Sequence, residues 1–345
     1  MRVAAIRLLA LLVALPAAAQ ETQTDPQIDD TIRASVVERL TSKIQAGYLI
    51  PEAAQVAIRN LRAAQESGEY KEIPRRRRSR QDSPRICVLR QRTNILPVFF
   101  DPEPAVPPSS STPPEQARER YNFGFAKIER LKGNVGYLDL RSFADLEQGR
   151  ETASTYLDAL ANFDGIIIDL RQNGGGNTPM AGYIASYFFG AKPVHFTDMY
   201  WRDQNKTVEV WTSENVVGRR SERQLLSILV GPSTFSAAED FAYSMQQLKR
   251  VTIVGERTGG GAHMGRGLQR LSPLFTAFIP VGESLNPVTK TNWENVGVQP
   301  DVKTPADKAL FEAHLAALRG LAERETNPGW QGDLRRAIAD VAAGK

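Results

Sequence analysis

The sequence contains few of the residues that form disulfides or bind metals. Its 345 residues include one cysteine, Cys87, and three histidines. A single thiol excludes an intrachain disulfide, so the stability of the fold must come from packing. His195 and His314 occur in strand-like and helical contexts without partners at metal-site spacing, so we expect structural roles for both. The sequence therefore implies neither a metal nor an organic cofactor.

Long hydrophobic runs are also scarce. The stretch Leu8–Leu15 is too short for a membrane span, and no later segment approaches the 18 or more apolar residues that a span requires. Arg2 and Arg7 precede this stretch, and the triplet Ala17–Ala19 follows it. This is the arrangement of a secretory signal peptide that is cleaved after Ala19 or after Gln20. We expect an exported protein, periplasmic or extracellular, without stable membrane insertion.

Positive charge is concentrated in one place. The chain has a net charge of +4 and an isoelectric point near 9.1. The stretch from Arg75 to Arg92 contains eight arginines and one acid, Asp82, and without it the remaining charge is about −3. Because the basic character is local, we do not expect a nucleic-acid partner.

Helical periodicity marks the first folded segment. Apolar residues recur at helical spacing from Ile28 to Ile44, and a second helix is predicted from Pro51 to Gly68. An arginine run and a proline- and serine-rich stretch follow, which indicate a loop or linker. We predict five regions: a signal peptide over 1–19, an N-terminal helical domain over 27–70, a basic and Pro/Ser-rich irregular segment over 71–118, the main domain over 119–303, and C-terminal helices over 304–345.

Strand and helix patterns alternate along the main domain, which predicts an α/β domain with a largely parallel sheet. The predicted strands are Val135–Leu140, Gly165–Leu170, Val208–Thr212, Leu225–Val230 and Val251–Gly255. Helices are predicted at Glu151–Asn162, Pro179–Phe189 and Ser236–Leu248. Leu268–Pro280 is expected to form a further pair of strands, and a capping box at Thr304–Asp307 is expected to start a closing helix.

Ser236 is the sharpest chemical candidate, because it follows an apolar strand and begins a predicted helix. At that position its hydroxyl lies at the positive end of the helix, and the N–H of Ala237 is free to donate to a developing oxyanion. The alternative is that Ser236 to Glu239 is a capping box without chemistry.

The glycine run Gly174–Gly176 also lies between a strand and a helix. In that context backbone N–H groups can form an anion-binding nest. An ordinary strand-to-helix turn is one alternative. A phosphate site is another, although neither the dinucleotide glycine spacing nor a glycine-lysine-serine ending occurs.

Together these segments resemble the tail-specific, or carboxyl-terminal processing, family of serine peptidases. The family's strand end, serine helix and glycine turn correspond here to Asp169–Gly176, Ser236–Glu239 and Val254–Gly259. The branch represented by interphotoreceptor retinoid-binding protein is closer still, on the motifs Ser186–Phe189, Glu209–Thr212, Ala238–Tyr243, Asn286–Thr289 and Trp293–Asp301. The resemblance covers residues 119–303 well.

This resemblance implies a fold and a set of roles. The fold expected is a crotonase-like or Clp-protease-like spiral α/β domain preceded by a small N-terminal helical domain. Ser236 is the implied nucleophile, and the N–H groups of Gly175 and Ala237 are the implied oxyanion hole. No additional peptide-binding domain, of the kind many processing peptidases carry, is visible between the helical pair and the sheet.

The general base is the missing part of the pattern. Dyad members of the family use a lysine after the Thr-x-Gly turn, where this chain has Gly261. Members that resemble the tricorn core protease use an upstream histidine supported by a glutamate; Glu294 fits that glutamate, or is a surface or capping carboxylate. The histidine is expected near residues 85–98, which contain none. His263 could substitute as base if its loop folds toward Ser236, or it is a loop residue.

The arginine-dense segment from Pro74 to Pro97 shows neither helical nor alternating periodicity, and the family pattern resumes at Val98. One hypothesis is that this segment was translated out of frame, through a sequence error or a frameshift in the gene; the alternative is a solvated basic loop. Resequencing that finds the same residues intact and in frame refutes the first.

Two functions from different classes follow. The first is an exported serine-type peptidase that cleaves peptide or protein substrates through an acyl-enzyme at Ser236. The second is a non-catalytic module for a hydrophobic, retinoid-like ligand, or an inactive copy that lacks its general base. The absent lysine and histidine favour the second, whereas the retained Ser236, glycine turn and Glu294 favour the first. Neither the substrate nor the oligomeric state follows from the sequence.

Overall fold

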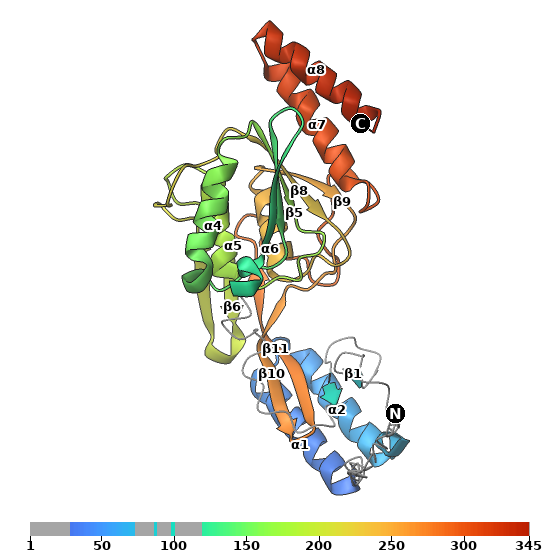
Figure 1. Ribbon diagram of the computed structural model, residues 1–345. Coiled ribbons are helices and arrows are strands. Elements are labelled where there is room, and N and C mark those ends of the chain that lie inside the picture. The colour runs from blue at the N-terminus through green and yellow to red at the C-terminus, as the bar shows by residue number, and fades with distance from the viewer. Residues whose placement is uncertain (1–27, 73–85, 88–97, 101–118, 345) are drawn as a thin grey trace, which may run out of the picture.

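The computed structural model describes residues 28–72, 86–87, 98–100 and 119–344. The predicted signal peptide and nearly all of the segment 74–97 lie outside these ranges. Figure 1 shows three tiers: a helical hairpin with a two-stranded ribbon at one end, a sheet covered by helices in the middle, and a second helical pair at the other end.

The middle tier is built on a six-stranded sheet of order β12-β9-β8-β5-β4-β3. All neighbouring strands are parallel except β3 and β4. The strands are β3 Phe125–Leu131, β4 Val135–Leu140, β5 Gly165–Asp169, β8 Leu225–Val230, β9 Thr252–Gly255 and β12 Val302–Lys303. The predicted α/β class and largely parallel sheet are confirmed, whereas β3 and β12 were not predicted.

Strand β5 shows why this sheet is covered on both faces. Every residue of β5 is buried, as expected for a central parallel strand. Ile166 and Ile168 point into one hydrophobic core and Ile167 into the other, because side chains alternate along a strand. The first core is closed by α4 Leu146–Leu160, α5 Thr178–Ala185 and α6 Ala237–Gln247, and the second by α7 Ala309–Arg324 and α8 Pro328–Ala342.

A second sheet is antiparallel throughout, with the order β1-β2-β11-β6-β7 and with β10 paired to β11. Its strands are β1 Ile86–Cys87, β2 Val98–Phe100, β6 His195–Trp201, β7 Lys206–Trp211, β10 His263–Ser272 and β11 Phe275–Leu285. The strand pair predicted at 268–280 exists but is longer than expected. Strand β6 was missed.

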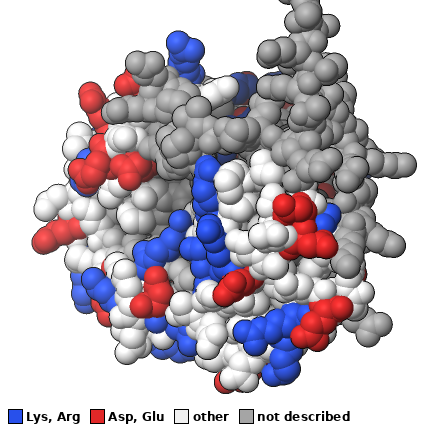
Figure 2. All heavy atoms as spheres, turned by 90° about the horizontal axis from the view of Figure 1, so that it is seen from below, with Lys and Arg blue, Asp and Glu red and all other residues white. Residues whose placement is uncertain are grey.

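Helices α1 Asp30–Gly47 and α2 Pro51–Glu66 pack on the ribbon formed by β10 and β11. Asp29 caps α1 by accepting the N–H of Ile32 at 2.8 Å, and Pro51 occupies the first turn of α2. The N–H of Leu49, between the helices, donates to the carbonyl of Pro280 on β11 at 2.9 Å. We call α1, α2 and this ribbon the helical module. Seen from its end, the described surface carries both signs of charge side by side (Figure 2).

The predicted start of the closing helix was wrong. Helix α7 begins at Ala309 with Lys308 as its N-cap, and no side chain caps it. Tertiary contacts hold the preceding segment outside the helix: the N–H of Ala306 donates to Glu256, and its carbonyl accepts a hydrogen bond from Arg171. Among the helices of the described residues, none has the length and apolar character needed to cross a bilayer.

Candidate active site

Ser236 lies in the tight turn between β8 and α6 and has an unusual backbone. Its φ and ψ angles are 54° and −123°, a region that side-chain-bearing residues rarely adopt and that costs about 1–3 kcal/mol. Such strain persists only where the surroundings impose it, and it is common at nucleophile turns. Ala237 follows as the first residue of α6, so its N–H has no carbonyl of an earlier helical turn to bind.

A buried carboxylate fixes this turn. Glu239 is fully buried and accepts the N–H of Ser236 at 2.9 Å, which is the carboxylate half of the predicted capping box. It also accepts hydrogen bonds from the Thr258 hydroxyl and from the N–H groups of Gly260 and Gly261. Glu239 therefore binds the nucleophile turn to the glycine turn that follows β9.

The glycine run lies directly against Ser236. A Cβ placed on Gly175, whose φ is +108°, would be 2.8 Å from Ser236 Cβ and 3.0 Å from the Ala237 nitrogen, so only glycine fits there. The N–H of Phe235 donates to the Asn173 carbonyl at 3.1 Å, which joins the two turns. The structure thus brings together three of the predicted site residues: Ser236, Gly175 and Ala237.

Asn173, which the sequence reasoning did not single out, organises the glycine run. Its side chain is fully buried; the amide donates to the Leu140 carbonyl, and the oxygen accepts the N–H of Gly175 at 2.9 Å. The Gly175 N–H therefore has an internal partner in this structure. An Asn next to a Gly-Gly-Gly turn was the available signal, because Asn side chains hydrogen-bond to the backbone two residues on.

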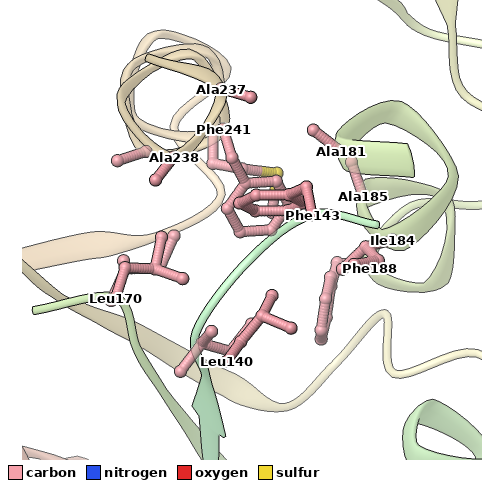
Figure 3. Close-up of a cluster of buried hydrophobic side chains, with 14 of the residues drawn as sticks. Leu140, Phe143, Leu170, Ala181, Ile184, Ala185, Phe188, Ala237, Ala238 and Phe241 are labelled. Carbon is pink, nitrogen blue, oxygen red and sulfur yellow. The ribbon is translucent and has the colours of Figure 1, made fainter. Parts of the chain in front are cut away.

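A dense apolar core lies under the nucleophile turn (Figure 3). Ala237 and Ala238 belong to the same buried cluster as Phe143, Phe241 and the side chains of α5. The ring centroids of Phe143 and Phe241 are 5.5 Å apart and tilted by 45°, a favourable aromatic geometry. The small alanine side chains let the first turn of α6 pack closely on this core. The core therefore supports the backbone that holds Ser236.

His263 and Glu294 form a second group. The Nδ1 atom of His263 lies 3.4 Å from Glu294 Oε1, and Glu294 Oε2 accepts the backbone N–H groups of Ala262 and His263 at 2.7 and 3.0 Å. Both side chains are mostly buried, with 16% and 22% exposed. Within the described residues, no hydrogen bond links His263 to Ser236.

The charge of Glu294 acts on Tyr48 in the helical module. Tyr48 is buried at the end of α1. Burial, and secondarily the negative charge of Glu294, raises the pKa of Tyr48 to about 12. Tyr48 therefore stays protonated near a carboxylate at neutral pH.

The remaining polar residues of the strand end have structural partners. Asp169 pairs with Arg171 at 2.6 Å and accepts the hydroxyl of Tyr137 at 2.7 Å. Burial alone would raise the pKa of Asp169, but the hydrogen bonds from Arg171 and Tyr137 outweigh it and hold that pKa below its ordinary value. Arg171 continues to the Ala306 carbonyl, so this pair attaches the segment before α7 to the sheet.

The sequence is similar to those of known peptidases. Residues 134–304 match the model of peptidase family S41. A probable CtpA-like serine protease of Staphylococcus epidermidis is 24% identical over 185 residues, which are 51% of this chain and 35% of that protein. A carboxy-terminal-processing protease of Bartonella bacilliformis is 25% identical over 50% of this chain and 39% of its own length. The chain thus spans less than two fifths of these relatives.

A photosystem II D1 C-terminal processing protease is similar among solved structures. Its sequence identity to this chain is 23%, and the match covers 50% of this chain and 43% of that one with a TM-score of 0.42. Ser236, Gly175, Ala237, His263 and Glu294 all lie within the matched residues 134–304.

Proposed function

Because residues 134–304 belong to peptidase family S41, we propose that this chain is a serine-type peptidase that cleaves peptide or protein substrates through an acyl-enzyme on Ser236. The observation that carries the proposal is the placement of Ser236. Its strained turn, the N–H of Ala237 and the glycine run meet at one point, which is what acyl transfer requires.

In the proposed reaction, the oxygen of the Ser236 hydroxyl attacks the scissile carbonyl carbon, and the carbonyl oxygen becomes negatively charged. The N–H of Ala237, at the positive end of α6, donates to that oxyanion. The N–H of Gly175 is the second donor and must share or exchange its hydrogen bond with Asn173. Each such donor is worth about 3–4 kcal/mol of transition-state stabilisation.

His263 is the proposed base. Glu294 lies beside its Nδ1 atom, which favours the tautomer with the proton on Nδ1 and leaves Nε2 to accept the serine proton. Glu294 also binds the backbone of His263, so it fixes both the position of the residue and its ring. Hydrogen bonds of catalytic groups are often longer in the free enzyme than in the substrate complex, so substrate binding must draw His263 toward Ser236.

The setting of the activity is part of the proposal. The sequence of the first 19 residues supports export, and with it processing of peptides or proteins in the periplasm or outside the cell. Carboxy-terminal processing is stated in the name of the Bartonella relative, and we extend it to this chain as the first activity to examine.

A fluorophosphonate probe tests the proposal directly. The purified protein is treated with the probe, and the adduct is mapped by mass spectrometry. Labelling of Ser236 that is absent in Ser236→Ala and strongly slowed in His263→Gln is expected. Lys290→Gln, a change in the same half of the chain outside the proposed machinery, should label normally.

No adduct on a folded protein contradicts the proposal. Saturable quenching of tryptophan fluorescence by a hydrophobic ligand, together with no labelling, would support a binding module instead. Labelling of Ser236 that persists unchanged in His263→Gln retains the peptidase class but removes His263 as the base.

A further inference from the structure

A second group of ligand-type side chains lies on the hairpin of β6 and β7. His195, Asp198 and Glu209 each contribute one nitrogen or oxygen atom, and these atoms lie within 4.8 Å of one another. The side chains of His195 and Asp198 are 24% and 17% exposed, so the group is half-buried and still open to solvent.

A β-bulge creates this arrangement. His195 pairs with Trp211 and Thr197 pairs with Val210, so β6 carries one extra residue between two consecutive positions of β7. Residues three apart normally point to opposite faces of a strand. The extra residue reverses this, so His195 and Asp198 face the same side, while Phe196 and Thr197 are buried.

The pairing also places two acids opposite each other. Asp198 is the direct partner of Glu209 in the register of β6 and β7. Like charges that face each other across an antiparallel pair destabilise it. The only basic side chain of the group, His195, lies 2.7 Å from Asp198 through its Nε2 atom. A cation shared by all three groups removes the repulsion and uses all three ligand atoms.

Trp211, which is not itself one of the three candidate ligands, contacts two of them, His195 and Glu209. Its ring stacks on His195 with a centroid distance of 4.4 Å and an interplanar angle of 10°. Its indole N–H donates to Glu209 Oε2 at 2.9 Å. Groups that orient metal ligands in this way are the usual outer support of a protein metal site. Trp211 is nevertheless 47% exposed, so burial does not explain its position.

We propose that His195, Asp198 and Glu209 form a binding site for one divalent transition-metal ion of the zinc type. One imidazole nitrogen and two carboxylate oxygens suit Zn²⁺, whereas Mg²⁺ and Ca²⁺ take oxygen ligands. Three protein ligands leave a fourth position for water. On binding, the ion replaces the direct hydrogen bond between His195 and Asp198 and joins β6 to β7. The site is independent of the proposed peptidase chemistry.

Titration of the metal-stripped protein tests the site. The full chain without a histidine tag is treated with a chelator, desalted, and titrated with Zn²⁺ by calorimetry and with Co²⁺ by visible absorption. One equivalent of each ion is expected to bind, with Co²⁺ absorption bands of a low-coordinate site. His195→Gln should weaken binding more than about 10-fold, and Trp211→Phe, which keeps a stacking ring but loses the N–H, about 10-fold.

His263→Gln is the matched control, because it removes the other partly buried histidine with a carboxylate neighbour. It should bind Zn²⁺ as the parent does. Glu209→Gln, an exposed change, keeps the test valid if His195→Gln does not fold by circular dichroism. Absence of saturable binding to the parent protein, or unchanged binding in both His195→Gln and Glu209→Gln, overturns the proposal. Loss of binding in His263→Gln alone places the ion at the other histidine and also overturns it.

Discussion

The sheet body, which is the six-stranded sheet with the helices that cover it, and the helical module each have a buried apolar core, but the two cores are assembled in different ways. The core under the nucleophile turn draws all its residues from one stretch, Phe125 to Val298. The core of the module joins residues 36–70 to residues 271–281, with Val98 between them in sequence. Side chains of α1 hydrogen-bond to β10 across more than 220 residues, as Arg39 does to the Leu271 carbonyl.

This difference matters because the two regions share one strand. Strand β10 begins at His263, beside Glu294, and ends in the core of the module at Leu271. The sheet body therefore holds Ser236, whereas the position of the proposed base depends on a ribbon that belongs to the helical module. The comparison predicts that the two regions contribute differently to stability and to activity.

The strongest test of the sheet body is Ser236→Ala. Activity should fall by at least about 10³-fold, because loss of a serine nucleophile removes the covalent route. The melting temperature should not fall, because the substitution removes only a hydroxyl from a strained turn. Peptide hydrolysis and thermal unfolding measure the two effects; hydrolysis at the parental rate would show that the sheet body does not carry the nucleophile at this position.

Truncation of each core compares the two regions directly. Ile168 and Ile44 are both fully buried, one in the sheet body and one in the module. Each change to Ala should lower the free energy of unfolding by about 2–5 kcal/mol, measured by urea denaturation. Because α1 packs on β10, Ile44→Ala should also reduce peptidase activity under conditions where the protein stays folded. Full activity in folded Ile44→Ala would show that the packing of the helical module does not affect the active site.

The glycine turn lies between Ser236 and β10, so substitutions there test the contact between the sheet body and the ribbon. A Cβ added to Gly261 would overlap the ring of Phe235, the residue before the nucleophile. Gly261→Ala should therefore cost about 1–3 kcal/mol of stability through overpacking. Phe235→Ala removes the ring, so Gly261→Ala should cost little stability when it is made in the Phe235→Ala background. A double-mutant cycle with no coupling energy contradicts the contact.

Asp240 supplies the smallest effect and a dependence on pH. It is fully buried on α6, and burial raises its pKa to about 7 against hydrogen bonds from Thr197, Ser284 and Ser244 that lower it. Between about pH 4 and pH 7 the folded state keeps a proton that the unfolded state has released, so stability falls as pH rises.

Asp240→Asn should flatten this slope, which cannot exceed about 1.4 kcal/mol per pH unit for one group. Urea denaturation from pH 4 to pH 8 measures the difference between variant and parent. Asp307→Asn, a change of an exposed carboxylate, controls for general loss of charge. Identical slopes in the parent and Asp240→Asn would show that the buried carboxylate does not titrate in this range.

The sequence was sufficient for the central strands of the sheet body, β4, β5, β8 and β9, because their signals are local. The continuous apolar run of β5 predicts a buried parallel strand, and the turns after β5 and β8 place Gly175 and Ser236 at the same sheet edge. Glu294 was proposed from motif and order, and His263 from its place just after the glycine run; the roles of both remain predictions.

The module and the second sheet were harder to predict because their pairing is distant. The ribbon pairs with strands far away in sequence, so its length could not be inferred from its own pattern. The bulge in β6 breaks the alternation that identifies strands, and it also hides the relation between His195 and Asp198. Glu256 and Arg171 reach the segment before α7 from the sheet, which a local capping signal cannot show.

The four hydrogen bonds of Glu239 have a consequence for slow motions. Three of them connect amides from two turns, at Ser236 and at Gly260 and Gly261, to one buried carboxylate, and the fourth comes from the Thr258 hydroxyl. A single amide of this set cannot open without leaving a charged oxygen short of a donor away from water. The three amides should therefore exchange with deuterated solvent at one common rate, as one cooperative unit. A peptide inhibitor that contacts only the nucleophile turn should then slow exchange in the glycine turn as well.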